Sequence, residues 1–346
     1  MSRAALSAVA AVALFGALAV PAAAASAAPE KAESVKPLTV KLAWYLPAGT
    51  AVDTQAKAIA AAIEKMSHGS IKVETYPGGS LLTETNMAHG LENNLVQMGV
   101  LGVHWWANQE PSTSFDSIPF LVPGPEKMLK ALHGQLGNDL RKILERHGVT
   151  IAGWGFYGYS GDYINNKHPI ETPADFKGLH MRSDGPLPAE FMKKYGAVAT
   201  TIDSSEVYTA LQRGTLDGAT SGMSSFISRK WIEVCKYVTA MKAWAAVYPT
   251  QVNAAWWNGL TPKQRDIISK AVASTEQANI KAINAEYNKD IQLAKEAGAH
   301  VYIPKGQVLA TWKKDARFMT AYYLEKAGAD GKKILHDLKP YEGPVG

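Results

Sequence analysis

Residue types that perform catalysis occur in this chain, but their spacing does not match the common catalytic motifs. Ser160 lies in Gly158-Tyr-Ser-Gly161, which lacks the Gly-x-Ser-x-Gly spacing of a nucleophile elbow. The segment Gly328-Ala-Asp-Gly331-Lys is too short to be a Walker A phosphate-binding loop. The nine histidines are scattered, without a His-Glu-x-x-His pattern or a close pair. We therefore expect a protein that is not an enzyme and that uses neither a metal nor a cofactor; measured turnover of a ligand would contradict this.

Aromatic side chains are the second group with chemistry suited to a ligand. Several of them stand at or near the ends of predicted strands: Trp44, Tyr45, Trp105, Trp106, Tyr159 and Trp244. Aromatic walls bury apolar or ring-bearing ligand surface, while tyrosine O–H and tryptophan N–H groups supply oriented hydrogen bonds. Large aromatic residues also fill protein cores, so we expect part of this set to be structural.

The N-terminus has the order of an export signal. Met1-Ser-Arg3 gives a short positive start, and an almost unbroken apolar run continues to Val20. Pro21 ends the run, and the small residues after it offer several Ala-x-Ala cleavage sites. This run is short for a membrane span. We predict a signal peptide over 1–28, a flexible leader over 29–37, and a periplasmic mature protein.

Length and charge narrow the class of partner. The chain has 346 residues, enough for two domains with substantial cores. Its formal net charge of +5 comes without a clustered basic run, so nucleic acid is a poor candidate and an anionic small molecule a better one. The single cysteine, Cys235, cannot form an intrachain disulfide, and we expect it to be buried.

Strand and helix patterns alternate along the mature chain. Apolar residues alternate with polar or small ones from Leu38 to Trp44, which predicts a first strand, and a helical pattern follows over 54–66. A second strand is predicted over 71–76. Thr261-Pro-Lys-Gln264 has the residues of a capping box with proline at the first helical position. This alternation predicts an α/β fold with largely parallel sheets.

The glycine-rich aromatic segment over 151–162 suits a crossover between two domains. We predict the first domain over 38–160 and about 250–275, and the second over 161–249 and about 300–346. A helix over about 262–297 contains no internal glycine or proline and is long enough to span both. Two α/β units joined in this way form a hinged cleft, as in periplasmic binding proteins, where helix N-termini favour an anion.

Four segments, in order along the chain, resemble the solute receptors of TRAP transporters, the tripartite ATP-independent periplasmic uptake systems (the DctP type). They are Leu42-Ala-Trp-Tyr-Leu-Pro47 with the strand that ends in Pro77-Gly-Gly79, Phe115-Asp-Ser-Ile-Pro-Phe-Leu121, the region from Phe176-Lys-Gly-Leu-His-Met-Arg182 to Ser205-Glu-Val-Tyr-Thr-Ala-Leu-Gln-Arg-Gly-Thr-Leu-Asp-Gly218, and Val252-Asn-Ala-Ala-Trp-Trp-Asn-Gly-Leu-Thr-Pro262. Each segment alone is a weak match, but together they span nearly the whole mature chain.

The resemblance implies a role for Arg182. In the family, the arginine after the Lys-Gly-Leu strand pairs with the carboxylate of the substrate, and this position is Arg182 here. A guanidinium is planar and permanently charged, and it can grip both carboxylate oxygens. Asp203 and Ser204 are expected to reach the same cleft.

Ser221 marks a departure from the family pattern. Many relatives have Glu-Asn-Pro after the Asp-Gly turn, whereas this chain has Ala219-Thr-Ser-Gly222. Ser221 stands where an asparagine often contacts the ligand, which puts the commonest dicarboxylate or sialic-acid-like specificity in doubt. With the aromatic residues, this favours an aromatic or otherwise bulky monocarboxylate over succinate.

The resemblance therefore implies a solute receptor that takes a small organic carboxylate to the small and large membrane subunits of a TRAP permease. A receptor for an ATP-driven importer or for a sensor kinase would use the same cleft physics and stays an alternative. A purely structural envelope protein is the third option, and failure to bind any small molecule would favour it.

Overall fold

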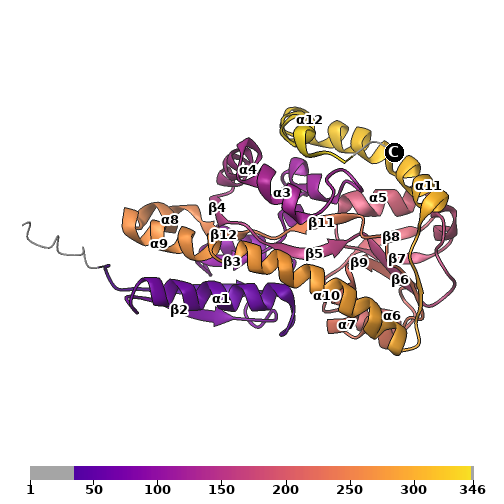
Figure 1. The fold of residues 1–346 in the computed structure, drawn as a ribbon, viewed down its shortest axis with the longest axis horizontal. Helices are drawn as coiled ribbons and strands as arrows, with labels where there is room; N and C mark the ends of the chain where they lie inside the picture. Colours follow the sequence, from indigo (N-terminus) through magenta and orange to yellow (C-terminus); the bar gives the residue numbers. More distant parts are fainter. Residues whose placement is uncertain (1–34, 344–346) are drawn as a thin grey trace, which may run out of the picture. The chain divides into compact units, whose positions relative to one another are not determined.

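Two sheets organise the chain, and each defines a lobe (Figure 1). The computed structural model describes residues 35–343, so the predicted signal peptide over 1–28 and most of the leader over 29–37 lie outside the described residues. The sheet of the first lobe contains, in spatial order, β2 (Ile71–Tyr76), β1 (Leu38–Trp44), β3 (Met98–Val100), β12 (Thr250–Asn253) and β4 (Val149–Gly153). Strands β1, β2 and β3 are parallel, and the returning β12 is antiparallel to both of its neighbours.

The second lobe is built on a mixed sheet. Its strands are, in spatial order, β13 (His300–Tyr302), β10 (Tyr237–Thr239), β6 (Asp162–Asn165), β9 (Gly218–Ser221), β7 (His180–Ser183) and β8 (Val198–Thr201). Strand β7 is parallel to both β8 and β9, and this places Arg182 opposite Thr200 and Ala219. The predicted α/β class is confirmed, as a two-lobed arrangement, but the expectation of largely parallel sheets is wrong, because β6 and β12 are each antiparallel to both of their neighbours.

A two-stranded ribbon connects the lobes. It pairs β5 (Phe156–Ser160) with β11 (Trp244–Val247) in antiparallel register, with Ser160 opposite Trp244. A Cβ on Gly161, which has φ +76°, would lie 2.3 Å from the Trp244 ring. Only glycine therefore fits at this exit from the ribbon.

Helices cover both sheets. Their bounds are α1 (Ala51–Met66), α2 (Met87–Glu92), α3 (Pro125–Leu132), α4 (Gln135–Glu145), α5 (Pro186–Lys194), α6 (Val207–Gln212), α7 (Met223–Ser228), α8 (Ala254–Gly259), α9 (Pro262–Ala273), α10 (Glu276–Glu296), α11 (Gly306–Ala316) and α12 (Phe318–Leu338). Short 3₁₀ helices are η1 (Val103–Trp106), η2 (Pro111–Ser117), η3 (Pro173–Phe176), η4 (Trp231–Glu233) and η5 (Lys339–Tyr341).

The segment over 262–297 forms two consecutive helices rather than one. The capping box predicted at Thr261 and Gln264 is confirmed at the start of α9. The helix is interrupted at Ser274 and Thr275, whose hydroxyls donate to the carbonyls of Ala271 and Val272 at 2.7 Å. Serine and threonine compete in this way with the backbone bonds of a helix. Helix α10 then runs from the first lobe past β5 to the second (Figure 1).

The C-terminal segment, predicted over about 300–346 to belong to the second domain, contacts both lobes. Trp312 of α11 packs on Tyr163 and Phe176 of the second lobe. Helix α12 instead packs on η2 and α4 of the first lobe, and the Tyr323 hydroxyl donates to the Ser112 carbonyl at 2.8 Å. Phe318, the first residue of α12, stacks on Phe191 of α5 in the second lobe, so α12 also contacts both lobes.

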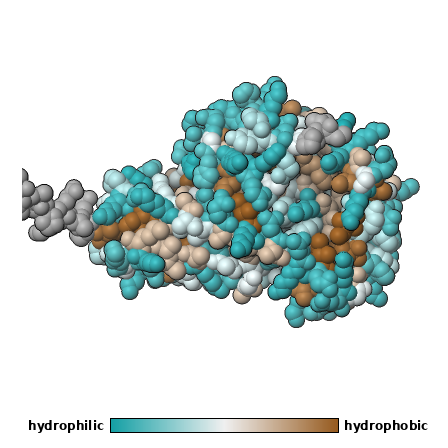
Figure 2. Space-filling model, viewed as in Figure 1, coloured by the Kyte–Doolittle hydropathy of each residue, from teal (hydrophilic) through white to brown (hydrophobic). Residues whose placement is uncertain are grey.

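Hydrophilic residues dominate the face drawn in Figure 2, and brown residues form small separate areas there. Within residues 35–343, no helix combines the length and the apolar composition that crossing a membrane requires. Cys235 is buried, as predicted.

Asp162 ties the segments that cross between the lobes. It is the first residue of β6, and its Oδ1 accepts the backbone N–H groups of Met241 (2.7 Å) and Lys242 (2.8 Å), which precede β11. The same oxygen accepts the hydroxyl of Tyr287 on α10 at 3.2 Å. Burial raises the pKa of this carboxyl to about 7, although these hydrogen bonds oppose the shift.

We predict that Asp162→Ala lowers the free energy of unfolding by about 2–4 kcal/mol, because buried N–H groups lose their acceptor. Asp162→Asn retains an acceptor oxygen but does not titrate. Because the folded pKa is raised, the folded chain holds this proton at higher pH than the unfolded chain does. Its contribution to stability therefore falls as pH rises from about 4 to 7. Urea unfolding across this window should show a flatter profile for Asp162→Asn than for the wild type; parallel profiles would contradict the assignment.

Candidate ligand-binding site

Arg182 is a charged side chain held inside the protein. It lies on β7, between β9 and the edge strand β8, and is only 1% exposed. Its Nε donates to the Ile202 carbonyl at 3.2 Å, and its Nη1 donates to the Thr220 carbonyl at 3.1 Å. These bonds fix the plane of the guanidinium group. Burial of a permanent cation is costly unless it is paired, so this position points to an anionic partner.

The partner comes from the first lobe. Glu84, in the loop before α2, is buried, and its Oε2 accepts Arg182 Nη2 at 3.1 Å and the backbone N–H of Ser204 at 2.7 Å. Beside it, the N–H and hydroxyl of Thr85 donate to Asp203 Oδ2 at 3.3 and 3.4 Å. Burial raises the pKa of Asp203, but hydrogen bonds from Ser205 and Thr85 outweigh it and hold the pKa below its usual value. The lobes therefore meet through two carboxylates around Arg182.

A group of buried tyrosines lies beside Glu84. The hydroxyls of Tyr45 and Tyr248 are 2.7 Å apart, and the rings of Tyr157 and Tyr248 have centroids 5.4 Å apart. Burial, together with the negative charge of Glu84, raises the pKa of both Tyr45 and Tyr248 well above the ordinary value. These phenols therefore stay neutral hydrogen-bonding groups.

His104 adds a second basic group. Its ring is 5.7 Å from that of Tyr248, and its Nδ1 is 3.4 Å from Asp116 Oδ2. Burial lowers the pKa of His104, but Asp116, with smaller contributions from Asp184 and Glu84, more than offsets this, so the net pKa is raised. A Cβ on Gly102 would lie 2.6 Å from this imidazole, so the turn before His104 requires glycine.

Several polar atoms around this cluster are buried and have no hydrogen-bond partner among the described residues. They are His104 Nε2, Trp105 Nε1, Ser204 Oγ and Asp184 Oδ1. Buried polar groups in native proteins are nearly always paired, with protein atoms, water or a ligand. Three of these atoms, His104 Nε2, Trp105 Nε1 and Ser204 Oγ, can donate a hydrogen bond to an oxygen-rich anion beside the buried arginine, whereas Asp184 Oδ1 can only accept one.

Of the residues predicted from the sequence, six lie in or next to this cluster: Arg182, Tyr45, Trp105, Asp203, Ser204 and Ser221. Ser221 ends β9 and directly precedes Gly222, whose carbonyl oxygen lies 3.3 Å from the Tyr157 hydroxyl oxygen. The Tyr157 hydroxyl also donates to Ser225 Oγ at 2.8 Å.

The other four predicted site residues make their hydrogen bonds and packing contacts outside this cluster. Trp44 donates its Nε1–H to Asp53 at 3.1 Å, and Trp106 donates to Gln251 at 2.8 Å, both inside the first lobe. The Tyr159 hydroxyl donates to Asn284 of α10 at 2.7 Å. Trp244 packs on Gly161 in the connecting ribbon. These four aromatic residues support the frame around the cluster.

The sequence reasoning missed Glu84, Asp184 and Tyr248 as site residues. Asp184 follows β7 two residues after Arg182, and its Oδ2 accepts the Ser160 hydroxyl at 3.3 Å. That spacing, at the end of the strand carrying Arg182, was a usable signal. Within residues 35–343, no group of three or more His, Cys, Asp or Glu side chains is placed to hold a metal ion.

Comparison with protein families gives one match that covers most of the chain. Residues 42–326 match the DctP family, described as "Bacterial extracellular solute-binding protein, family 7". A C4-dicarboxylate-binding periplasmic protein DctP from Rhodobacter capsulatus is 32% identical over 274 residues, covering 76% of this chain and 79% of the relative. The 2,3-diketo-L-gulonate-binding periplasmic protein YiaO of Escherichia coli is 26% identical over 240 residues, covering 69% and 73%.

Solved structures share the fold. The sugar acid binding protein DctPAm from Advenella mimigardefordensis, in complex with galactonate, superposes with a TM-score of 0.82 and 20% identity, covering 89% of this chain and 99% of that one. A TRAP periplasmic solute binding protein from Desulfovibrio salexigens, with bound orotic acid, gives a TM-score of 0.82 and 22% identity, covering 88% and 98%.

Proposed function

Because the chain belongs to bacterial extracellular solute-binding protein family 7, among the solute-binding proteins of TRAP transporters, we propose that it captures a small organic carboxylate between its lobes. It then delivers this ligand to the small and large membrane subunits of a TRAP permease. Membership of this family makes the chain a transport protein and not an enzyme. Delivery to a membrane permease fits a mature protein in the periplasm, released from a signal peptide over 1–28.

The observation that carries the proposal is the state of Arg182. A guanidinium has five N–H donors, and three of them bind Ile202, Thr220 and Glu84. One N–H on Nη1 and one on Nη2 remain for a ligand carboxylate. Paired, charge-assisted bonds of this kind are among the strongest in proteins. Arg182 is therefore the proposed anchor.

The surrounding groups favour a ring-bearing or bulky monocarboxylate with further oxygen atoms. The rings of Tyr45, Tyr157, Tyr248 and His104 offer apolar faces, while His104 Nε2 and Trp105 Nε1 offer unpaired positions for ligand acceptors. The raised pKa of His104 favours the imidazolium, which attracts an anion. Orotic acid in the Desulfovibrio salexigens protein and pyroglutamic acid in a Bordetella pertussis receptor are ring-bearing acids with one carboxyl group.

A thermal-shift screen of the mature, ligand-free protein tests this function. The panel contains aromatic, 2-oxo, hydroxy, sugar and dicarboxylic acids, together with the corresponding amides as uncharged controls. We expect one class of acid to raise the unfolding midpoint, because a ligand that binds only the folded state stabilises it by mass action. The matching amide should have no effect. If no acid raises the unfolding midpoint of the folded protein, or if the amide raises it as much as the acid does, the protein is not a carboxylate receptor.

A further inference from the structure

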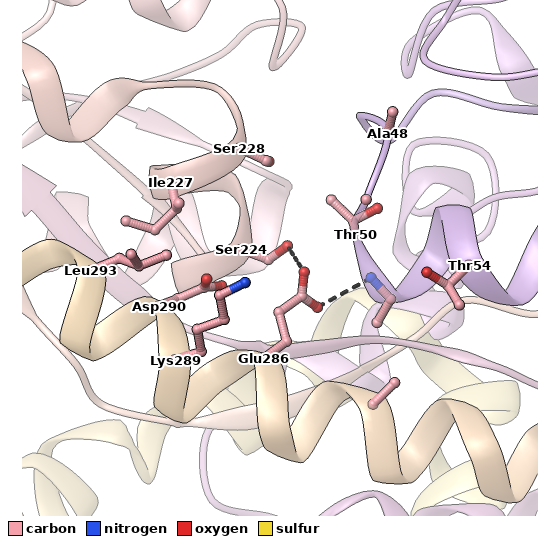
Figure 3. Close-up of a pocket in the computed structure, with 13 residues that line it drawn as sticks. Ala48, Thr50, Thr54, Ser224, Ile227, Ser228, Glu286, Lys289, Asp290 and Leu293 are labelled. Atoms are coloured by element: carbon pink, nitrogen blue, oxygen red, sulfur yellow. Dashed lines mark hydrogen bonds between the residues drawn. The ribbon is translucent and has the colours of Figure 1, made fainter.

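A pocket lies away from Arg182, where α10 passes both lobes (Figure 3). It measures about 270 Å³. Its wall comes from the first lobe at Ala48–Thr54, from α7 in the second lobe, and from α10. Aliphatic side chains line part of it: Ala48, Ala51, Ile227, Ala282 and Leu293. The pocket therefore exists only while these three parts of the chain are together.

Glu286 of α10 holds the pocket together across the lobes. Its Oε1 accepts the hydroxyl of Ser224 on α7 at 3.0 Å, and its Oε2 accepts the backbone N–H of Ala51 on α1 at 3.2 Å (Figure 3). One carboxylate thus joins α1, α7 and α10, and each of its two oxygens has a hydrogen-bond donor.

Asp290, one turn further along α10, is different. It is only 5% exposed, it lines the pocket, and its Oδ2 has no hydrogen-bond partner among the described residues. Ser228 Oγ, in the same wall, is also buried without a partner. Burial, with the nearby charge of Glu286, raises the pKa of Asp290 to about 7, although Lys289 opposes this shift. A buried carboxylate oxygen without a donor is costly, which points to an absent partner.

The residues that line the pocket indicate what kind of ligand would pair with Asp290. Two carboxylates face one ammonium, that of Lys289, so the pocket has room for one further positive charge. The unpaired oxygens of Asp290 and Ser228 accept N–H donors, and the aliphatic walls suit a short hydrocarbon chain. We propose that this pocket is a second binding site, for a small primary alkylammonium ion, with Asp290 as its counter-ion.

Titration calorimetry with n-butylammonium chloride on the whole ligand-free protein tests the site directly. At about pH 8, above the pKa of Asp290, the carboxylate is ionised. We expect saturable binding that Asp290→Asn weakens by about tenfold or more, since the substitution removes a buried charge-assisted partner. Glu296→Gln is the matched control: it removes one carboxylate from an exposed position on the same helix and should leave the binding unchanged.

Two further measurements make the outcome decisive. Ala282→Leu narrows the pocket without changing any charge, so it should also abolish binding; this variant serves if Asp290→Asn does not fold. Sodium chloride at equal ionic strength and n-butanol, which has the same chain without the charge, should not bind. Wild-type affinity in folded Asp290→Asn or Ala282→Leu, or equal binding of n-butanol or sodium, would overturn the proposal. None of these tests uses an organic acid, so their failure is distinct from failure of the proposed function.

Because both lobes form the wall, occupancy should favour the closed arrangement. If the proposed function holds, linkage requires that a saturating concentration of n-butylammonium tightens binding of the organic acid, about two- to tenfold. The effect should vanish in Asp290→Asn. An unchanged acid affinity, with the amine shown to be bound, would overturn this coupling.

Discussion

Arg182→Ala is expected to weaken binding of the organic acid by more than about a hundredfold. Removing one partner of a buried, hydrogen-bonded charge pair costs about 3–5 kcal/mol, part of which reflects the ligand carboxylate that is left unpaired. Titration calorimetry with the acid identified by the thermal-shift screen measures this loss. Near-wild-type affinity in the folded variant would refute Arg182 as the anchor.

Arg182 also supports the second lobe through Ile202 and Thr220 and neutralises Glu84, so Arg182→Ala removes these structural bonds together with the anchor. Arg182→Lys keeps the positive charge but cannot reproduce the planar fork, so we expect it to fold and still to bind at least about tenfold more weakly. Arg265→Ala is the matched control. Its Nη1 also binds backbone carbonyls, of Trp257, Asn258 and Leu260, on the first lobe. It should lower the unfolding midpoint and leave the affinity unchanged.

Sequence patterns correctly predicted the strands and helix ends that are determined by residues close together in the sequence. Strand β1 alternates apolar and polar residues and β2 follows a glycine turn, and both have the predicted bounds. The start of α9 depends on a capping box that is complete within four residues. The apolar segment over 247–257 has the composition of a strand, but it forms the short β12 followed by α8. Asn253 decides this, because its side chain accepts the Trp256 N–H and caps the helix, a local signal that the apolar run obscured.

The sequence predicted the site residues that lie within one recognisable segment, but not those that reach the site from a distant part of the chain. Arg182 stands in a long, family-like segment, but Glu84 reaches it from 98 residues away, on the other lobe. No periodicity marks such a contact, since it depends on how the two lobes close. Trp44 and Trp106 show the opposite error, because the sequence predicted them as site residues and the structure places their polar groups in the core. Their positions at or after strand ends suggested a cleft, yet buried acceptors, Asp53 and Gln251, hold their indole N–H groups inside the first lobe.

Glu84→Ala should weaken binding of the organic acid by about ten- to a hundredfold. Glu84 is the contact from the first lobe that reaches both Arg182 and the Ser204 N–H, and charge-assisted hydrogen bonds contribute about 1.5–3 kcal/mol each. Losing them makes closure less favourable, and the apparent affinity falls with the population of the closed form. Calorimetry measures the affinity, and small-angle scattering of the ligand-free protein should show a larger radius of gyration.

The direction of this change separates two roles for Glu84. If the ligand carboxylate uses the two remaining N–H groups of Arg182, Glu84 stays in place as a clamp and its removal weakens binding. If instead Glu84 occupies the position that the ligand takes, the variant loses a competitor and binds more tightly, which would refute the clamp. Glu84→Gln retains the shape and an acceptor oxygen without the charge, so the clamp predicts an intermediate affinity. Glu74→Ala, at an exposed position on β2 of the same lobe, controls for the loss of a carboxylate and should bind as the wild type does.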